Sequence, residues 1–82
     1  MQINLLTTFN DGTKKTISAT AADLVAFEAK FDLSVARLEK EVKLTHLLFL
    51  AWHSEKRNKA TALEFEAWVE TVVGVEAEEV KK

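Results

Sequence analysis

The sequence predicts an α+β fold that is mainly α, with an N-terminal β-hairpin followed by three helices, the second of them the longest. Three observations lead to this prediction. A period of two runs through the first nine residues and ends in a turn signal. Two pairs of a threonine and an acidic residue three positions later mark helix starts. No proline or glycine interrupts the stretch from Ser34 to Asn58. At 82 residues the chain is expected to form a single domain, residues 1–82.

The hairpin is expected over residues 1–19. Ile3, Leu5 and Phe9 fall on one side of a strand at a period of two, and a strong turn signal, Asn10-Asp11-Gly12, follows directly. Residues 13–18 would form the return strand. Because a two-stranded hairpin alone is only marginally stable in water, we expect this one to lie on the helices or to take a third strand from a partner chain.

A three-helix body is expected over residues 20–74. Thr20 and Asp23 can form a capping box that starts the first helix, on which Leu24, Phe27 and Phe31 share one face. Around residues 32–34 this pattern breaks. Ser34 can then cap a second helix that continues to about Asn58.

The third helix is expected to open with a capping box formed by Thr61 and Glu64. Its core stripe has the i, i+3, i+4, i+7 spacing and consists of Phe65, Trp68, Val69 and Val72. Gly74 is expected to end this helix. Residues 75–82 are short and charged, which predicts a frayed tail.

The second helix carries two apolar stripes. The first is expected to build the core and consists of Val35, Leu38, Val42, Thr45, Phe49 and Trp52. The second points to roughly the opposite side of the helix and consists of Leu44, Leu47, Leu48 and Ala51.

Two interpretations of the second stripe stay open. A helix that is apolar nearly all round is typically buried, so the second stripe can be ordinary core between the hairpin and the other helices. Alternatively, part of it stays exposed and holds a partner helix. On the second interpretation the partner-binding residues are Leu44, Leu47, Leu48 and Ala51, with Trp68 as an anchor.

Composition and charge narrow the function classes. The chain is 48% hydrophobic and 29% charged, as expected for a folded globular protein. Its formal net charge of -2 gives no overall attraction to nucleic acid or to anionic lipid, so neither is an expected partner. The absence of cysteine excludes disulfides and thiolate metal sites, and fits a reducing cytosol. The first residues do not resemble a signal peptide, and no apolar run approaches the roughly 20 residues of a membrane span, which predicts a soluble, unexported protein.

No residue pattern predicts catalysis. His46 and His53 are seven positions apart, too far to share a metal ion as i, i+4 histidines do, and we expect neither a metal nor a cofactor. The basic cluster Lys56-Arg57-Asn58-Lys59 is explained by the dipole at the end of the second helix. The acidic C-terminal third is explained as a solvated face, and no glycine-rich phosphate loop or Ser-His-acid group stands out. The chain is therefore not expected to be an enzyme.

The order of segments resembles a known family. A hairpin with an Asp-Gly turn precedes ADLVAFEAKFDLSVA (residues 22–36), LLFLAWHSEKR (residues 47–57) and LEFEAWVETVVGVE (residues 63–76). This layout resembles the small tail assembly chaperones of long-tailed bacteriophages. The likeness covers most of the chain and consists of a capped amphipathic helix, an L-x-x-L-A-W-x-x-x-[KR] helix and an F-x-x-[WF]-[VL]-x-x-V helix.

The resemblance implies a late phage protein that acts in the host cell cytoplasm during virion morphogenesis and is absent from the mature virion. Such a chaperone binds the long, helical tape measure protein and keeps it soluble while tail tube subunits assemble around it. The tail tube protein and a second copy of the chain are further expected partners. In this family a longer form often arises by ribosomal frameshifting, for which codons of Lys81 and Lys82 are a candidate site. The family has no active-site motif to carry over.

Two other functions remain open at this stage. A structural virion component, such as a tail or connector subunit, could assemble through the edges of the hairpin. A small nucleic-acid-binding regulator could contact phosphate through residues 56–59, although the net acidity of the chain disfavours it.

Overall fold

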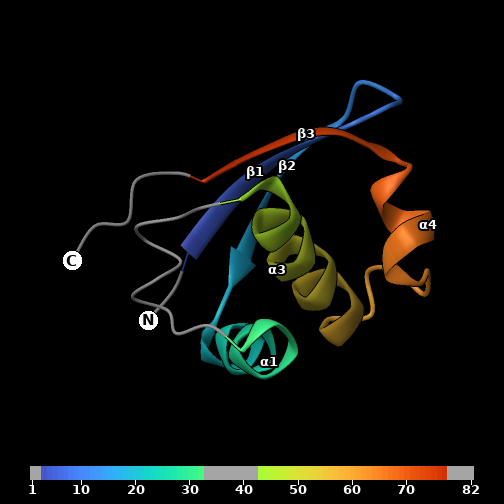
Figure 1. Ribbon diagram of the computed structural model, residues 1–82. Coiled ribbons are helices and arrows are strands. Elements are labelled where there is room, and N and C mark those ends of the chain that lie inside the picture. The colour runs from blue at the N-terminus through green and yellow to red at the C-terminus, as the bar shows by residue number, and fades with distance from the viewer. Residues whose placement is uncertain (1–2, 33–42, 78–82) are drawn as a thin grey trace.

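The computed structural model describes residues 3–32 and 43–77, which form a three-stranded antiparallel sheet with helices on one side (Figure 1). In chain order the elements are β1 (Ile3–Phe9), β2 (Lys14–Ala19), α1 (Ala21–Phe31), α3 (Leu44–Arg57), α4 (Phe65–Val69) and β3 (Val72–Ala77). The strand order is β2-β1-β3, so β1 lies in the centre. The prediction of a mainly α fold, a hairpin followed by three helices, is wrong because the C-terminal segment returns to the sheet.

The third strand replaces the end of the predicted third helix. The helix α4 ends at Val69, and β3 pairs antiparallel with β1 from Ala77 opposite Leu5 to Val72 opposite Phe9. Residues 72–77 are rich in valine, whose β-branched side chain is stiff in a helix and packs well on a pleated surface. Gly74 therefore lies within a strand, and residues 75–77 are not a frayed tail. Residues 78–82 lie outside the described residues.

The predicted hairpin is confirmed. Leu5 faces Ile17 in the β1–β2 pairing, and the turn between the strands contains Asp11, whose Oδ1 accepts a hydrogen bond from the backbone N–H of Thr13 at 2.8 Å. Gly12 has a φ of 91°, a conformation that glycine adopts at no steric cost. The hairpin obtains its third strand from its own chain.

The predicted start of α1 is also confirmed. Thr20 is the N-cap residue, and its backbone N–H donates to Oδ2 of Asp23 at 2.9 Å, one half of the predicted capping box. At the other end α1 stops at Phe31, and Asp32 follows in the left-handed region with a φ of 54°.

The second predicted helix ends where expected, with Asn58 as C-cap, but begins late. The residue before α3, Lys43, is extended with φ of -108° and ψ of 150°, so no continuous helix runs from Ser34 to Asn58. Helix propensity is a weak prior, and the absence of helix breakers permits a helix without requiring one. Ser34, with the stripe positions Val35, Leu38 and Val42, lies outside the described residues.

The core lies between the inner face of the sheet and the helices. Along β1 every second side chain is buried, namely Ile3, Leu5 and Thr7. The helix α3 lies across this face, with α1 and α4 on either side of it (Figure 1). Contacts with α3 come from all the other described elements. The central helix therefore positions every surface discussed below.

Candidate functional site

The described surface is hollowed between the end of α1, one side of α3 and α4. This aromatic groove has a volume of about 530 Å³, within the roughly 300–1,000 Å³ typical of binding pockets. It is lined by Lys30, Phe31, Thr45, Phe49, Trp52, Glu64 and Phe65. Most of the lining is apolar, and the charged residues lie at its rim.

Three helices supply the aromatic side chains. Phe49 and Trp52 are three residues apart on α3 and share one face of it. Phe31 is the last residue of α1 and Phe65 the first of α4, so one ring comes from each neighbouring helix. Ring centroids are 5.3 Å apart for Phe31 and Phe49 and 5.7 Å apart for Trp52 and Phe65. Phe49 is buried and forms the floor, while the other three rings are only partly buried.

The wall formed by α4 is fixed to α3 by polar contacts. The indole Nε1–H of Trp52 donates to the carbonyl oxygen of Leu63 at 2.8 Å. Lys56 Nζ lies 3.2 Å from Oε1 of Glu64 and 5.3 Å from the centroid of the Trp52 ring. Thr61 Oγ1 accepts the backbone N–H of Leu63, and the N-cap of α4 is Glu64, so the helix starts three residues later than predicted. These contacts hold the orientation of Trp52.

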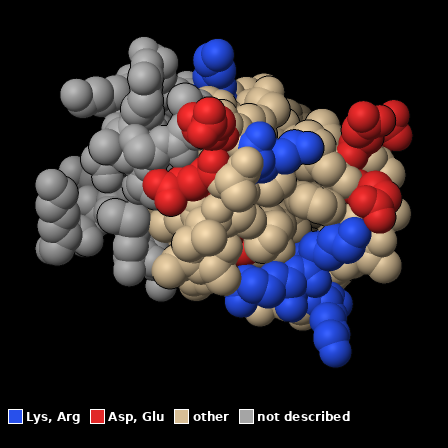
Figure 2. Space-filling model, turned by 60° about the horizontal axis from the view of Figure 1, so that its bottom comes forward, with Lys and Arg blue, Asp and Glu red and all other residues tan. Residues whose placement is uncertain are grey.

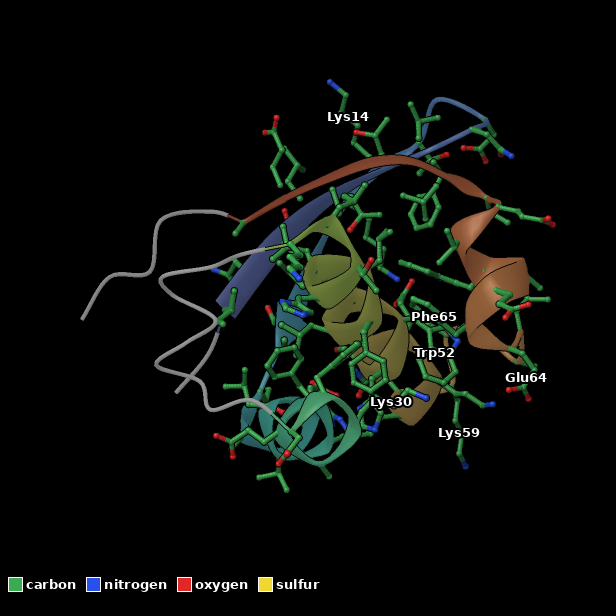
Figure 3. All side chains as sticks on the ribbon, in the orientation of Figure 1. Lys14, Lys30, Trp52, Lys59, Glu64 and Phe65 are labelled. Atoms are coloured by element: carbon green, nitrogen blue, oxygen red, sulfur yellow. The ribbon has the colours of Figure 1, made fainter. Side chains whose placement is uncertain are left out.

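Charges surround the groove unevenly. Figure 3 shows Trp52 and Phe65 side by side between α3 and α4, with Lys30 and Lys59 extending beyond one end of the pair and Glu64 on the side of α4. In Figure 2 many Lys and Arg side chains gather in a band on the lower part of the face, with further basic side chains above it, and acidic side chains lie at the right edge and at the upper left. A molecule in the groove would therefore meet apolar surface first and cations at one end.

The predicted partner-binding stripe is mostly buried. Leu47 and Leu48 are each 8% exposed and Ala51 is fully buried, because this side of α3 packs on the sheet. Trp68 is 2% exposed and meets Phe9 edge to face at 6.1 Å. Leu44 alone of the five is exposed, at 60%. Four of these five side chains are therefore buried in the described structure, and partner binding by this side of α3 stays an untested prediction.

Sequence reasoning missed the groove because it assigned the groove residues to the core. Phe31, Phe49, Trp52 and Phe65 satisfy the spacing of core stripes, and Phe49 does lie in the core. The available signal was a large ring at the last position of α1, Phe31, and another at the first position of α4, Phe65. The first stripe of α3 faces α1 and α4 rather than the sheet, and the short α4 leaves part of it uncovered.

A buried carboxylate ties α1 to the end of α3. Asp23 is fully buried, and its oxygens accept hydrogen bonds from Arg57 Nε at 3.2 Å and Arg57 Nη2 at 3.0 Å. His53 Nδ1 lies 2.6 Å from Oδ1 of the same carboxylate. Burial raises the pKa of Asp23, but hydrogen bonds from Arg57, His53 and the Thr20 backbone outweigh it and hold the pKa below its ordinary value. The cluster positions the helices that form the groove.

The lowered pKa of Asp23 predicts a loss of stability in acid. The Asp23 carboxylate contributes its full stabilisation above the pKa that it has in the unfolded chain, about 4, because Asp23 is then ionised in both the folded and the unfolded state. This stabilisation shrinks below that pH, where the unfolded state takes up the proton first, and it is lost once the pH falls through the lower folded pKa. We expect the difference in free energy of unfolding between wild type and Asp23→Ala, from urea titrations at several pH values, to narrow below about pH 4. A constant difference would contradict this assignment.

The two histidines have separate surroundings. His46 is buried between Phe27 and Phe31, with ring centroids 5.0 Å and 4.9 Å away, and its Nδ1 has no hydrogen-bond partner within the described residues. Burial, with a smaller effect of Lys43, lowers its pKa. His53 is bound to Asp23. In residues 3–32 and 43–77 no group of three metal-binding side chains is brought together.

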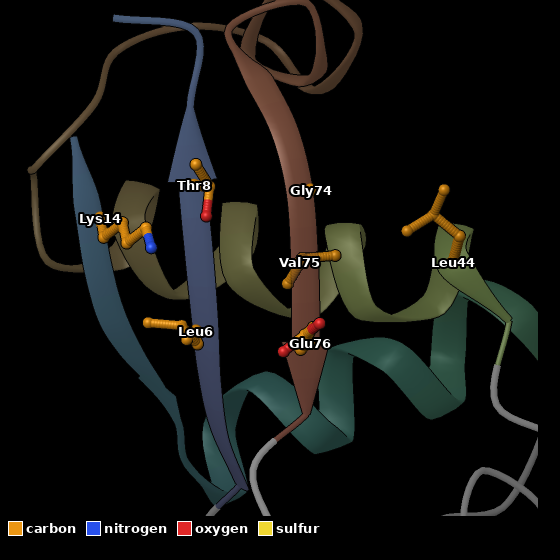
Figure 4. A pocket seen from close by; sticks show the side chains of 7 residues that line it. All are labelled: Leu6, Thr8, Lys14, Leu44, Gly74, Val75 and Glu76. Carbon is orange, nitrogen blue, oxygen red and sulfur yellow. The ribbon is translucent and has the colours of Figure 1, made fainter. Parts of the chain in front are cut away.

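A smaller hollow, of about 320 Å³, lies around β3 (Figure 4). Figure 4 shows Leu44 on one side of β3 and the side chains from β1 and β2 on the other. It is lined by Leu6, Thr8, Lys14, Leu44, Gly74, Val75 and Glu76. Its lining is more polar than that of the aromatic groove, which makes the groove the stronger candidate for binding apolar side chains.

Comparison with known proteins gives no relative. No protein-family model, curated protein or solved structure matches the chain. Among the helices of the described segments, none has the length and apolar character to cross a membrane.

Proposed function

We propose that this chain is a bacteriophage tail assembly chaperone that holds a helical segment of the tape measure protein in the aromatic groove. The observation that carries the binding role is an open groove lined mostly by aromatic side chains, a surface that a protein of this size would bury unless a partner covered it. The identity of the partner comes from the resemblance of the segment order. The proposed site is the groove and no longer the leucine stripe of α3.

The lining favours a helical partner segment over an extended one. An extended peptide usually binds by adding to a sheet edge, because its backbone N–H and C=O groups need partners. The groove is built from helix side chains, and the indole N–H of Trp52 is already bonded to Leu63. A helix satisfies its own backbone and presents apolar side chains at i, i+3 and i+7. An amphipathic helix therefore fits this groove.

Co-expression tests the proposal. The probe is the proposed partner, a long helical tape measure protein, produced with wild type or with either of two variants. Thr45 is exposed and lines the groove, so Thr45→Arg places a long charged side chain inside it. Thr16 is also exposed but lies on β2, outside the groove lining, so Thr16→Arg is the matched control.

We expect wild type and Thr16→Arg to increase the soluble fraction of the long protein several-fold and to co-purify with it. Thr45→Arg should lose both effects while its melting temperature stays within a few degrees of wild type. No gain of solubility with wild type would contradict the chaperone proposal. Equal activity of both variants would show that the groove is not the site.

A structural virion subunit is the second candidate. It is favoured by the outer edge of β3, which pairs with β1 on one side and with no other strand in the described part of the chain. Val73 and Leu44 are exposed, at 71% and 60%, and exposed apolar edges promote association. Detection of the chain in purified virions would support this candidate, because a transient chaperone leaves before the particle is complete.

A further inference from the structure

We infer that the helix held in the aromatic groove carries carboxylates beside its apolar stripe, on the side that faces Lys30 and the end of α3. The inference rests on the proposed function and specifies the chemistry of the partner. The partner class is an amphipathic helix with aspartate or glutamate flanking its apolar residues, as opposed to one flanked by lysine or arginine.

The ion pairs at the rim leave positive charge without a partner. Lys56 is bound to Glu64, and Arg57 to the buried Asp23. Lys30, which lines the groove, and Lys59, which follows α3, form no ion pair within the described residues. The surplus is local, because the whole chain has a formal net charge of -2.

Within residues 3–32 and 43–77, acidic side chains do not cancel this surplus. Among these residues Glu64 is the acidic one in the lining, and its carboxylate is already bound by Lys56. Asp32 follows Phe31 in the chain and, like Lys59, lies outside the groove lining, so the surplus at the groove itself is the charge of Lys30. Lys30 projects beside the apolar rings (Figure 3), so a carboxylate one turn away from a buried apolar side chain can reach its ammonium group.

Such contacts select a partner more than they strengthen binding. An ion pair at a solvated rim adds little to affinity, but placing a like charge there opposes binding and slows association. A single rim charge is therefore expected to change affinity about 3- to 10-fold between acidic and basic partners at low salt. The difference should vanish near 1 M salt, where the Debye length is about 3 Å.

Two synthetic peptides test the inference. Both are helical and carry the same leucine and phenylalanine stripe; one has glutamate and the other lysine at the flanking positions. Dissociation constants are measured by fluorescence anisotropy at low and high salt. Lys30→Glu is compared with Lys14→Glu, which changes the net charge equally but lies on β2 away from the groove (Figure 3).

We expect wild type and Lys14→Glu to bind the glutamate peptide about 3- to 10-fold more tightly at low salt, and Lys30→Glu to lose or reverse this preference. Thr45→Arg should weaken both peptides. Equal affinities for the two peptides, or the same loss of preference in both charge variants, would overturn the inference and leave the chaperone proposal standing. Failure of the glutamate peptide to bind would also overturn it. Co-expression tests the chaperone proposal separately.

Discussion

Replacing Leu48 by lysine is expected to lower the free energy of unfolding by about 4 kcal/mol or more, enough to unfold much of a small domain. Leu48 is 8% exposed on the side of α3 that packs on the sheet. The change removes roughly 1.5–3 kcal/mol of apolar burial and places an ammonium group where few waters can reach it. Circular dichroism during urea unfolding measures the effect.

The same substitution at Leu44 is the matched control. Leu44 lies one helical turn earlier on α3 and is 60% exposed, so Leu44→Lys should change the free energy of unfolding by less than about 0.5 kcal/mol. If both variants kept wild-type stability, the second stripe would be a surface feature after all. Equal and large losses at both positions would show that Leu44 is also buried in solution.

Asp23→Ala is expected to cost about 2–3 kcal/mol. The fully buried carboxylate accepts hydrogen bonds from Arg57, His53 and Thr20, and hydrogen bonds to a charged group contribute about 1.5–3 kcal/mol each before compensation. Arg57 and His53 retain side-chain exposures of 35% and 30%, so both can be rehydrated, which keeps the total below the simple sum.

Glu76→Ala is the control for this experiment. Glu76 is an exposed acid on β3, and its removal should change the free energy of unfolding by less than about 0.5 kcal/mol. Differential scanning calorimetry of the two variants measures both effects under one condition. A loss for Asp23→Ala no larger than that for Glu76→Ala would show that the buried cluster does not stabilise the contact between α1 and α3.

Local signals predicted the elements that local interactions decide. The turn residues Asp11 and Gly12 fixed the hairpin, and the pair Thr20 and Asp23 fixed the start of α1. Each involves residues within three positions of one another. The end of α3 at Asn58 was likewise predicted from the adjoining sequence.

Long-range pairing decided what the sequence pattern could not. Residues 65–72 have a helical spacing, yet the helix ends at Val69 and Val72 pairs with Phe9 on β1, far away in the chain. The N–H of Asn10 also donates to the carbonyl oxygen of Thr71 at 2.8 Å, which joins the hairpin turn to the start of β3. Whether the end of this segment continues the helix or starts a third strand therefore depends on its pairing with β1.

The same limit explains why sequence reasoning did not point to the aromatic groove. Two apolar stripes on α3 indicated that two faces need covering, but not which neighbour covers which face. The added strand completes the sheet against which Leu47, Leu48 and Ala51 are buried. The shorter α4 leaves Trp52 and Phe65 partly exposed. Which face of α3 is buried and which stays accessible therefore depends on the topology, and residue type alone does not decide it.

The indole N–H signals of the two tryptophans test the central claim, that the aromatic groove is the binding surface. Trp52 lines the groove, whereas Trp68 is buried in the core beside Phe9. A ¹H–¹⁵N spectrum of the labelled protein resolves both signals, which Trp52→Phe assigns. On titration with the glutamate-flanked helical peptide, we expect the Trp52 signal to shift saturably while that of Trp68 stays in place. A shift of Trp68 with Trp52 unmoved, or saturable binding with neither signal moved, would contradict the account.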